Sequence, residues 1–123
     1  LTSWTLGATA GANTVTASVS GLTGSPVTFS ATGTVGAAAN IAATSVVTQS
    51  ANAGTAVAAP PTVRVTDAFG NPVANVAVTF AVTAGGGAIN ATSVTTNALG
   101  VAALTSWTLG ATAGANTVTA TVA

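Results

Sequence analysis

The sequence predicts an all-β protein, folded as a β-sandwich of about seven to eight strands. β-Branched Val and Thr dominate, and apolar and polar residues alternate with the period of two that is typical of half-buried strands. Turn-forming residues separate these stretches at intervals of about 8–12 residues, and no segment has a helical period. The length of 123 residues gives room for one domain and a fragment of another.

An internal repeat organises the chain. Residues 1–17, LTSWTLGATAGANTVTA, recur identically as residues 104–120, at an offset of 103 residues. Self-similarity at a fixed offset indicates a tandem repeat, so the chain holds one full period and an overlap. We expect residues 1–34 to be the C-terminal strands of a preceding repeat. Residues 35–123 then form a repeat that lacks its own last strand.

Alternating apolar positions place the strands. Strands are expected near residues 26–33, 41–48, 55–59, 62–67, 73–83, 88–96, 100–109 and 115–122. In the strand at 62–67, Val63 and Val65 should point inward. The strand at 73–83 should bury Val76, Val78, Phe80 and Val82. The strand at 100–109 should present one face made of Val101, Ala103, Thr105, Trp107 and Leu109. The last strand should bury Val118, Ala120 and Val122.

Turn residues separate these strands. The stretch Asp67-Ala68-Phe69-Gly70-Asn71-Pro72 is typical of a hairpin loop. Asp67 should cap the turn, Gly70 should take the left-handed conformation and Pro72 should start the return strand. The run Gly85-Gly86-Gly87 predicts a second connection, and Pro60-Pro61 predicts an interruption where an edge strand changes sheets.

The composition excludes most catalytic and cofactor chemistry. The chain has one cation, Arg64, and one anion, Asp67, and it contains no Lys, Glu, His, Cys, Met or Tyr. A nucleophile–histidine arrangement, a pair of carboxylates and a zinc, iron or calcium site therefore lack their side chains. One Arg also cannot supply the charge that nucleic-acid binding requires. We expect no enzyme activity, no cofactor, no metal and no nucleic-acid partner.

The low charge is itself informative. Charged residues make up 2% of the chain, whereas about a quarter is usual in soluble domains. Such a chain either carries glycans or is built to associate. Hydrophobic residues make up 49%, but no stretch approaches the roughly 18–20 apolar residues of a membrane helix. We therefore expect no membrane insertion by this segment.

Two long stretches resemble a known family. Residues 63–87, VRVTDAFGNPVANVAVTFAVTAGGG, and residues 96–122, TNALGVAALTSWTLGATAGANTVTATV, resemble the bacterial immunoglobulin-like repeats of the invasin and intimin type. Its recurring marks here are the turn at 67–72, the V-x-V-x-F strand that ends at Phe80, the turn at 97–100 and the stretch 107–110. Residues 24–33 are similar to the last strand of that family. The chain departs from the family pattern in having fewer Asp, Lys and Glu residues.

The resemblance implies an immunoglobulin-like β-sandwich from an extracellular or cell-surface protein. Such repeats act mainly as rigid spacers in the stalks of outer-membrane adhesins. The first functional hypothesis is therefore a structural module, either a stalk unit or the building block of an extracellular filament. Its partners are neighbouring copies of the same repeat, in a covalent array or a head-to-tail polymer. The alternative is an adhesion module that binds a glycan or a host protein through its loop tips.

Several side chains have a structural and a functional interpretation. Asp67 can cap its turn or bind a cation at a domain junction, and turn chemistry favours the cap. Arg64 alternates with inward Val residues, so an outward, solvated position is favoured over a ligand grip. Trp107 and Trp4 are expected in the core of their sandwiches rather than as sugar platforms. Phe69 lies at a predicted loop tip and is the candidate contact with a neighbour or ligand.

Two further features concern modification and assembly. Asn90-Ala91-Thr92 is an N-glycosylation acceptor pattern, with Asn90 as the acceptor. Val27, Phe29 and Ala31 alternate along the candidate assembly strand. Two copies of the 104–120 segment exist, but only one copy of this partner strand. We expect the missing strand to come from the next unit, by strand addition if the units are separate subunits.

Overall fold

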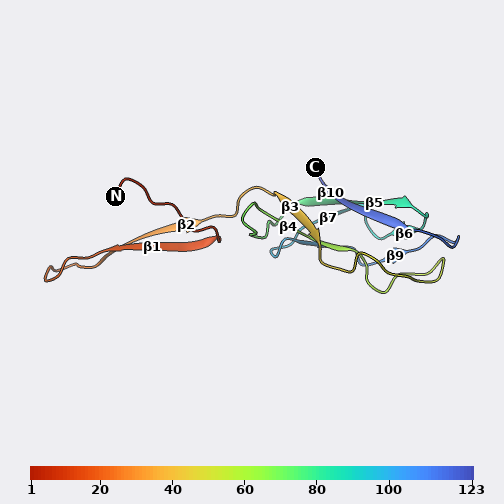
Figure 1. Ribbon diagram of the computed structural model, residues 1–123, viewed down its shortest axis with the longest axis horizontal. Helices are drawn as coiled ribbons and strands as arrows, with labels where there is room; N and C mark the ends of the chain where they lie inside the picture. Colours follow the sequence, from red (N-terminus) through yellow and green to blue (C-terminus); the bar gives the residue numbers. More distant parts are fainter.

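The computed structural model describes residues 1–123 as an all-β chain with ten antiparallel strands and no helix. Two parts are visible in Figure 1. A hairpin of β1 (Gly11–Ala17) and β2 (Val27–Gly33) projects away from a body that contains all the other strands. The N-terminus lies beside the hairpin and the C-terminus lies on the body. No helix of this structure is long and apolar enough to span a membrane.

The body contains three small sheets. The first has the order β3-β4-β8, from β3 (Asn40–Ala43), β4 (Thr62–Thr66) and β8 (Val101–Ala103). The second has the order β10-β5-β7, from β10 (Thr117–Val122), β5 (Ala77–Ala84) and β7 (Ser93–Thr95). The third pairs β6 (Ala88–Ile89) with β9 (Trp107–Thr108). The strands are short because turns and bends interrupt most of the predicted stretches.

The core is drawn from both three-stranded sheets. Its buried cluster consists of Val63, Val65, Val78, Phe80, Ala102 and Leu104. These are alternate residues of β4 and β5, together with β8 and the residue that follows it. The inward faces predicted for 62–67 and 73–83 are confirmed, since Val63, Val65, Val78 and Phe80 are buried and Arg64 and Thr79 are exposed. Period two therefore identified four of the six residues of the buried cluster.

The face predicted for 100–109 is wrong in its first half. Ala102 and Leu104 are buried, whereas Ala103 and Thr105 are exposed. The chain then bends at Thr105 and resumes as β9 with Trp107 buried. At the bend, the Asn90 side-chain oxygen accepts hydrogen bonds from the backbone N–H groups of Thr105 (2.8 Å) and Ser106 (3.1 Å). A one-residue shift exchanges the two faces of a strand, which alternation alone cannot detect.

Other strand boundaries differ from the predicted ones because of local interactions. The stretch 41–48 pairs only as far as Ala43, because the Ser45 hydroxyl then accepts the Thr62 N–H at 2.9 Å and the chain leaves β4. The stretch 55–59 contributes a single bridge, from Ala56 to Thr108. β5 begins only at Ala77, after Asn75 with a positive φ of 62°. The stretch 88–96 is divided into β6 and β7.

Candidate assembly site

The outer edge of β10 has no partner strand. β10 lies at the end of its sheet and pairs only with β5, with Val118 opposite Val82 and Ala120 opposite Phe80. Val118, Ala120 and Val122 are half-buried and pack against the core cluster, whereas the intervening Thr residues are exposed. Neither Lys nor Pro occurs along this strand, although these residues commonly protect exposed edges. The edge is therefore open to pairing.

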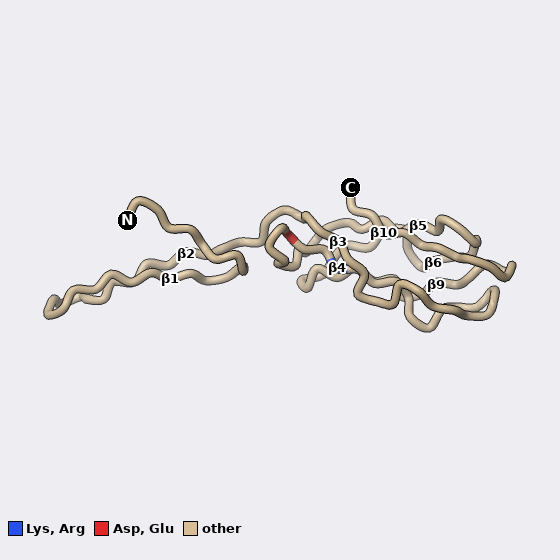
Figure 2. The backbone as a smooth tube through the Cα atoms, in the orientation of Figure 1, with Lys and Arg blue, Asp and Glu red and all other residues tan.

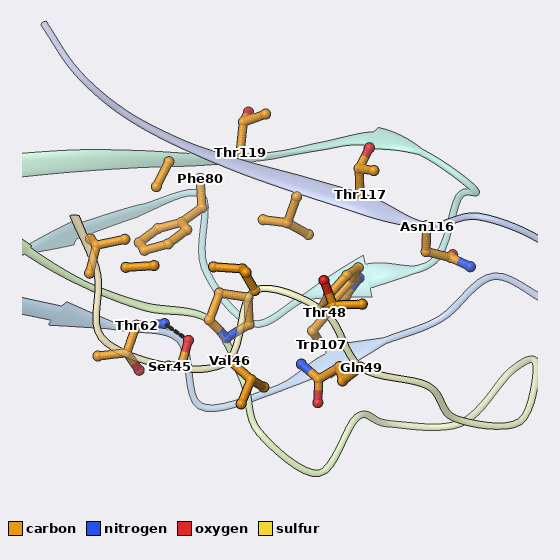
Figure 3. A pocket seen from close by; sticks show the side chains of 16 residues that line it. Ser45, Val46, Thr48, Gln49, Thr62, Phe80, Trp107, Asn116, Thr117 and Thr119 are labelled. Carbon is orange, nitrogen blue, oxygen red and sulfur yellow. Dashed lines mark hydrogen bonds between the residues drawn. The ribbon is translucent and has the colours of Figure 1, made fainter. Parts of the chain in front are cut away.

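A groove runs along this open edge. It has a volume of about 350 Å³ and lies between β10 and residues 45–49. Figure 3 shows the ring of Phe80 between β10, which carries Thr117 and Thr119, and the segment that carries Ser45 and Val46. Phe80, Val63 and Trp107 contribute apolar surface to its lining. A strand placed beside β10 would cover the part of the core that faces this groove.

The groove also contains a buried polar atom without a partner. Trp107 is 9% exposed, and its Nε1–H makes no hydrogen bond. An unpaired buried donor costs on the order of 1–3 kcal/mol. The residue also lines a second cavity of about 220 Å³ next to the groove, together with Gln49 and Asn116. Trp107 is thus the buried residue that the sequence predicted, but its indole N–H has no hydrogen-bond acceptor.

The predicted assembly strand is β2. It pairs with β1 over seven residues, with Val27 opposite Ala17 and Phe29 opposite Val15. Val27 and Phe29 are 49% and 54% exposed, and Ala31 is half-buried. No other strand is paired with this hairpin. The chain therefore has an apolar strand face that is poorly covered, and an open groove in which half of the lining residues are hydrophobic.

The two copies of the repeated segment adopt the same local geometry. In the first copy, the Asn13 side-chain oxygen accepts the Gly7 N–H at 3.0 Å and its Nδ2 donates to the Gly11 carbonyl at 3.2 Å. In the second copy, Asn116 makes the same bonds to Gly110 at 3.0 Å and to Gly114 at 3.1 Å. The local turn is therefore encoded in the segment itself.

A polar joint connects the hairpin to the body. Asn71 accepts the Ala10 N–H at 2.9 Å and donates from Nδ2 to the Ala8 carbonyl at 2.8 Å. Asp67 accepts the Gly36 N–H at 3.0 Å and the Asn71 side-chain N–H at 3.0 Å. Both side chains are buried. We call this group of Asp67 and Asn71, with the backbone of Ala8, Ala10 and Gly36, the joint. Figure 2, in which Asp and Glu are red, shows the acidic position on the body, at the end nearest the hairpin.

The joint grows out of the predicted hairpin loop. Asp67 Oδ1 accepts the N–H groups of Phe69 (3.0 Å) and Asn71 (2.9 Å), and Gly70 has a φ of 86°. The backbone N–H of Gly36 is the largest influence on the pKa of the Asp67 carboxyl. With the hydrogen bonds from Asn71 and Phe69, it lowers this pKa from 3.8 to about 2, although burial acts in the opposite direction. The turn-capping interpretation of Asp67 is the one that the structure shows.

The other candidate residues lie apart from the groove. Phe69 is 75% exposed at the loop tip, and it lines the hollow between the hairpin and the body. Arg64 is exposed, and its Nε donates to the Leu99 carbonyl at 3.2 Å. Asn90 is exposed, and its side-chain oxygen is the acceptor at the 105–106 bend. Trp4 is 39% exposed, so the core position predicted for it is not present in this chain.

Two parts of the site were missed by the sequence analysis. The sequence does not predict the buried contacts of Asn71 with Ala8 and Ala10, which span more than 60 residues. The predicted strand at 41–48 includes residues 46–48, whereas these residues and Gln49 form one wall of the groove. The Asp67-x-x-x-Asn71 spacing predicts the bonds within the turn, but not the contacts of Asn71 with the chain before β1. No local signal identifies the groove wall.

Comparisons with protein-family models, curated proteins and solved structures found no match to this chain. Its function is therefore inferred from the repeated segment, the open edge of β10 and the joint.

Proposed function

We propose that this chain is a non-enzymatic structural module of a repetitive extracellular surface protein. In this proposal, residues 35–123 form an immunoglobulin-like β-sandwich that a strand from the neighbouring unit completes. Residues 1–34 are the last strands of the preceding unit. The module serves as a rigid stalk segment or as the building block of an extracellular filament.

One observation carries the proposal. The same 17-residue sequence contributes to β1, which is paired with β2, and to β10, which is paired with β5 on one edge and has no strand on the other. A segment that is paired with β2 in one copy and has a free edge beside a groove in the other is what a serial assembly of identical units requires. Contacts that join different surfaces produce an open linear array when successive units do not close into a ring.

The joint supports the mechanical part of the proposal. Two buried polar side chains fix the first part of the chain to the second through backbone groups, without any long flexible connection. Buried polar groups with satisfied hydrogen bonds specify one arrangement, because any other leaves them unpaired. Successive units joined in this way keep a fixed orientation, as a spacer requires.

A second candidate is adhesion through the loop tip. The large exposure of Phe69, at 75%, favours it, since aromatic side chains often anchor interfaces. In this case the partner is a glycan or a host protein. A glycan array probed with the chain and with F69A would detect such binding as signals that the variant loses.

Negative-stain microscopy of the native material, with denaturing mass analysis of the same sample, tests the main proposal. We expect linear arrays. Arrays that denature to a polypeptide of one period indicate non-covalent assembly, and a polypeptide of many periods indicates a covalent stalk. Isolated small particles would contradict both versions.

A matched pair of variants sharpens the test with the recombinant chain. F29D places a charge on the apolar face of β2, and T28D places the same charge on its opposite face. Phe29 and Thr28 are both exposed in the single chain, so neither change should unfold it. If the chain polymerises by strand addition, F29D should abolish the polymer and T28D should retain it.

A further inference from the structure

We propose that the groove beside β10 binds β2 of a second copy, antiparallel to β10, with Val27 opposite Ala120 and Phe29 opposite Val118. This inference depends on the proposed function, and it adds the identity of the donor strand, the acceptor surface and the register. The groove is the one between β10 and residues 45–49 described above, and 8 of its 16 lining residues are hydrophobic.

The register follows from the repeat. β2 pairs with β1 so that Val27 lies opposite Ala17, Phe29 opposite Val15 and Ser30 opposite Thr14. Residues 11–17 and 114–120 have the same sequence, and their local turns have the same hydrogen bonds. Adding the offset of 103 residues transfers this pairing to Ala120, Val118 and Thr117. A shift by one residue would point the apolar face of β2 away from the core.

The chosen register also directs the correct face into the groove. Side chains directly opposite each other in an antiparallel pair lie on the same face of the sheet. Val118 and Ala120 pack against the core cluster, so Phe29 and Val27 would point toward Phe80 and Val63. Thr28 and Ser30 would remain outside with Thr119 and Thr117, which are exposed.

The move of β2 from β1 to β10 changes the burial of its side chains more than its backbone pairing. β2 would leave β1 and pair with the same residues on β10, so the backbone hydrogen bonds and cross-strand neighbours are replaced in kind. The difference is the surface beneath the strand. On β1, Val27 and Phe29 are about half exposed, whereas on β10 they would lie over the groove and cover its half-buried Val118 and Ala120 and its exposed Val46. Burial of apolar surface therefore favours the exchange.

A second copy is the occupant that this geometry favours. Figure 1 shows the hairpin outside the body, and the chain's own β2 is connected to β3 by the short segment 34–39. The joint holds the chain on the N-terminal side of this hairpin against the body. Another copy carries the same strand without this connection.

Engineered disulfides test the register, because the chain contains no Cys. A copy with V27C is mixed under oxidising conditions with a copy that carries either A120C or V118C. The first pair is in the proposed register and the second is displaced by two residues on the same face. Opposite residues fall within disulfide distance and displaced ones do not. We expect the in-register heterodimer to form about 10-fold faster or more.

A second set of cysteine pairs, at exposed positions, tests the same register without changing the core. S30C mixed with T117C is in the proposed register, and S30C mixed with T119C is displaced. All three positions are exposed, so these substitutions leave the core unchanged. V27C mixed with F69C measures random collision. Equal rates for in-register and displaced pairs, or rates no higher than for the F69C mixture, would overturn the inference.

Microscopy of the unmodified chain separates this inference from the proposed function. Linear arrays without in-register cross-links would mean that the units assemble through another surface, so the inference fails and the function stands. In-register cross-links in a sample that forms no array longer than a pair would support the inference and contradict the filament. Cross-linked arrays support both.

Discussion

Two copies of one sequence occupy different surroundings in this chain, and their comparison separates what is local from what is tertiary. Residues 1–17 and 104–120 share the same asparagine-centred turn. Their burial differs, since Trp4 is 39% exposed and Trp107 is 9% exposed. Local hydrogen bonds therefore form wherever the segment occurs, whereas burial depends on the strands that surround it.

β1 and β10 also differ in their partner strands and in the covering of their apolar faces. β1 has the partner strand β2 but little covering for its apolar face, whereas β10 lies on a core but has no partner on its outer edge. Each copy lacks what the other has. In the proposed array, β2 leaves β1 and supplies the partner that the outer edge of β10 lacks.

The largest expected difference between the copies is at the two tryptophans. W107A should destabilise the body by about 3–5 kcal/mol, because it removes a buried aromatic side chain and leaves a cavity. W4A should change the free energy of unfolding by about 0.5 kcal/mol or less, as is usual for exposed positions. Urea unfolding followed by circular dichroism measures both. Equal effects would show that the two copies are equally embedded.

The joint provides the next test, because Asn71 is the residue through which the body holds the first copy. N71A should cost about 1–3 kcal/mol, since it removes bonds to Ala8, Ala10 and Asp67. It should also increase the maximum dimension of the chain measured by X-ray scattering, because the hairpin is released from the body.

N97A is the matched control for this variant. Asn97 caps the turn before β8 by accepting the N–H groups of Leu99 (2.9 Å) and Val101 (3.1 Å), but it makes no bond to the hairpin. N97A should therefore destabilise the body without changing the scattering profile of the folded chain. A released hairpin in N97A, or a fixed one in N71A, would show that Asn71 does not hold the joint.

The alternation of apolar and polar residues predicted correctly the strands that have one buried face and no interruption. Val63, Val65, Val78 and Phe80 were placed correctly, because a strand with one buried face needs no other information. The same rule failed at Ala102 and Leu104, since the bend that shifts the phase is stabilised by Asn90, 15 residues upstream of Thr105. Side chains that reach across a fold leave no periodic signal at the place they affect.

The candidate site was predictable in part for a similar reason. The unequal number of the repeated segment and of its partner strand indicated an unpaired strand, and β10 has one free edge. The groove was not predictable, because its wall at 46–49 is formed where the Ser45 hydroxyl turns the chain away from β4. The joint needed the contact of Asn71 with the backbone of Ala8 and Ala10, which carries no sequence preference.

The smallest expected change in stability comes from Asp67, because its carboxyl is protonated only at acid pH. The pKa of this carboxyl is lowered from 3.8 to about 2 in the folded chain, chiefly by the Gly36 N–H. A lowered pKa means that the unfolded chain binds the proton more readily. The stabilisation is therefore complete above about pH 4, and it is lost as the pH falls from about 4 to about 2.

Asp67 is the only Asp or Glu in the chain, so acid unfolding reports this carboxyl with little interference. The urea midpoint of the wild-type chain should be constant from pH 7 to about pH 4 and should then fall. In D67N this fall should be absent, because the amide does not titrate. Since Asp67 also accepts the Asn71 side-chain N–H, scattering at pH 2 should show the same loosened hairpin as N71A at pH 7. A hairpin that stays fixed at pH 2 would assign the joint to Asn71 alone.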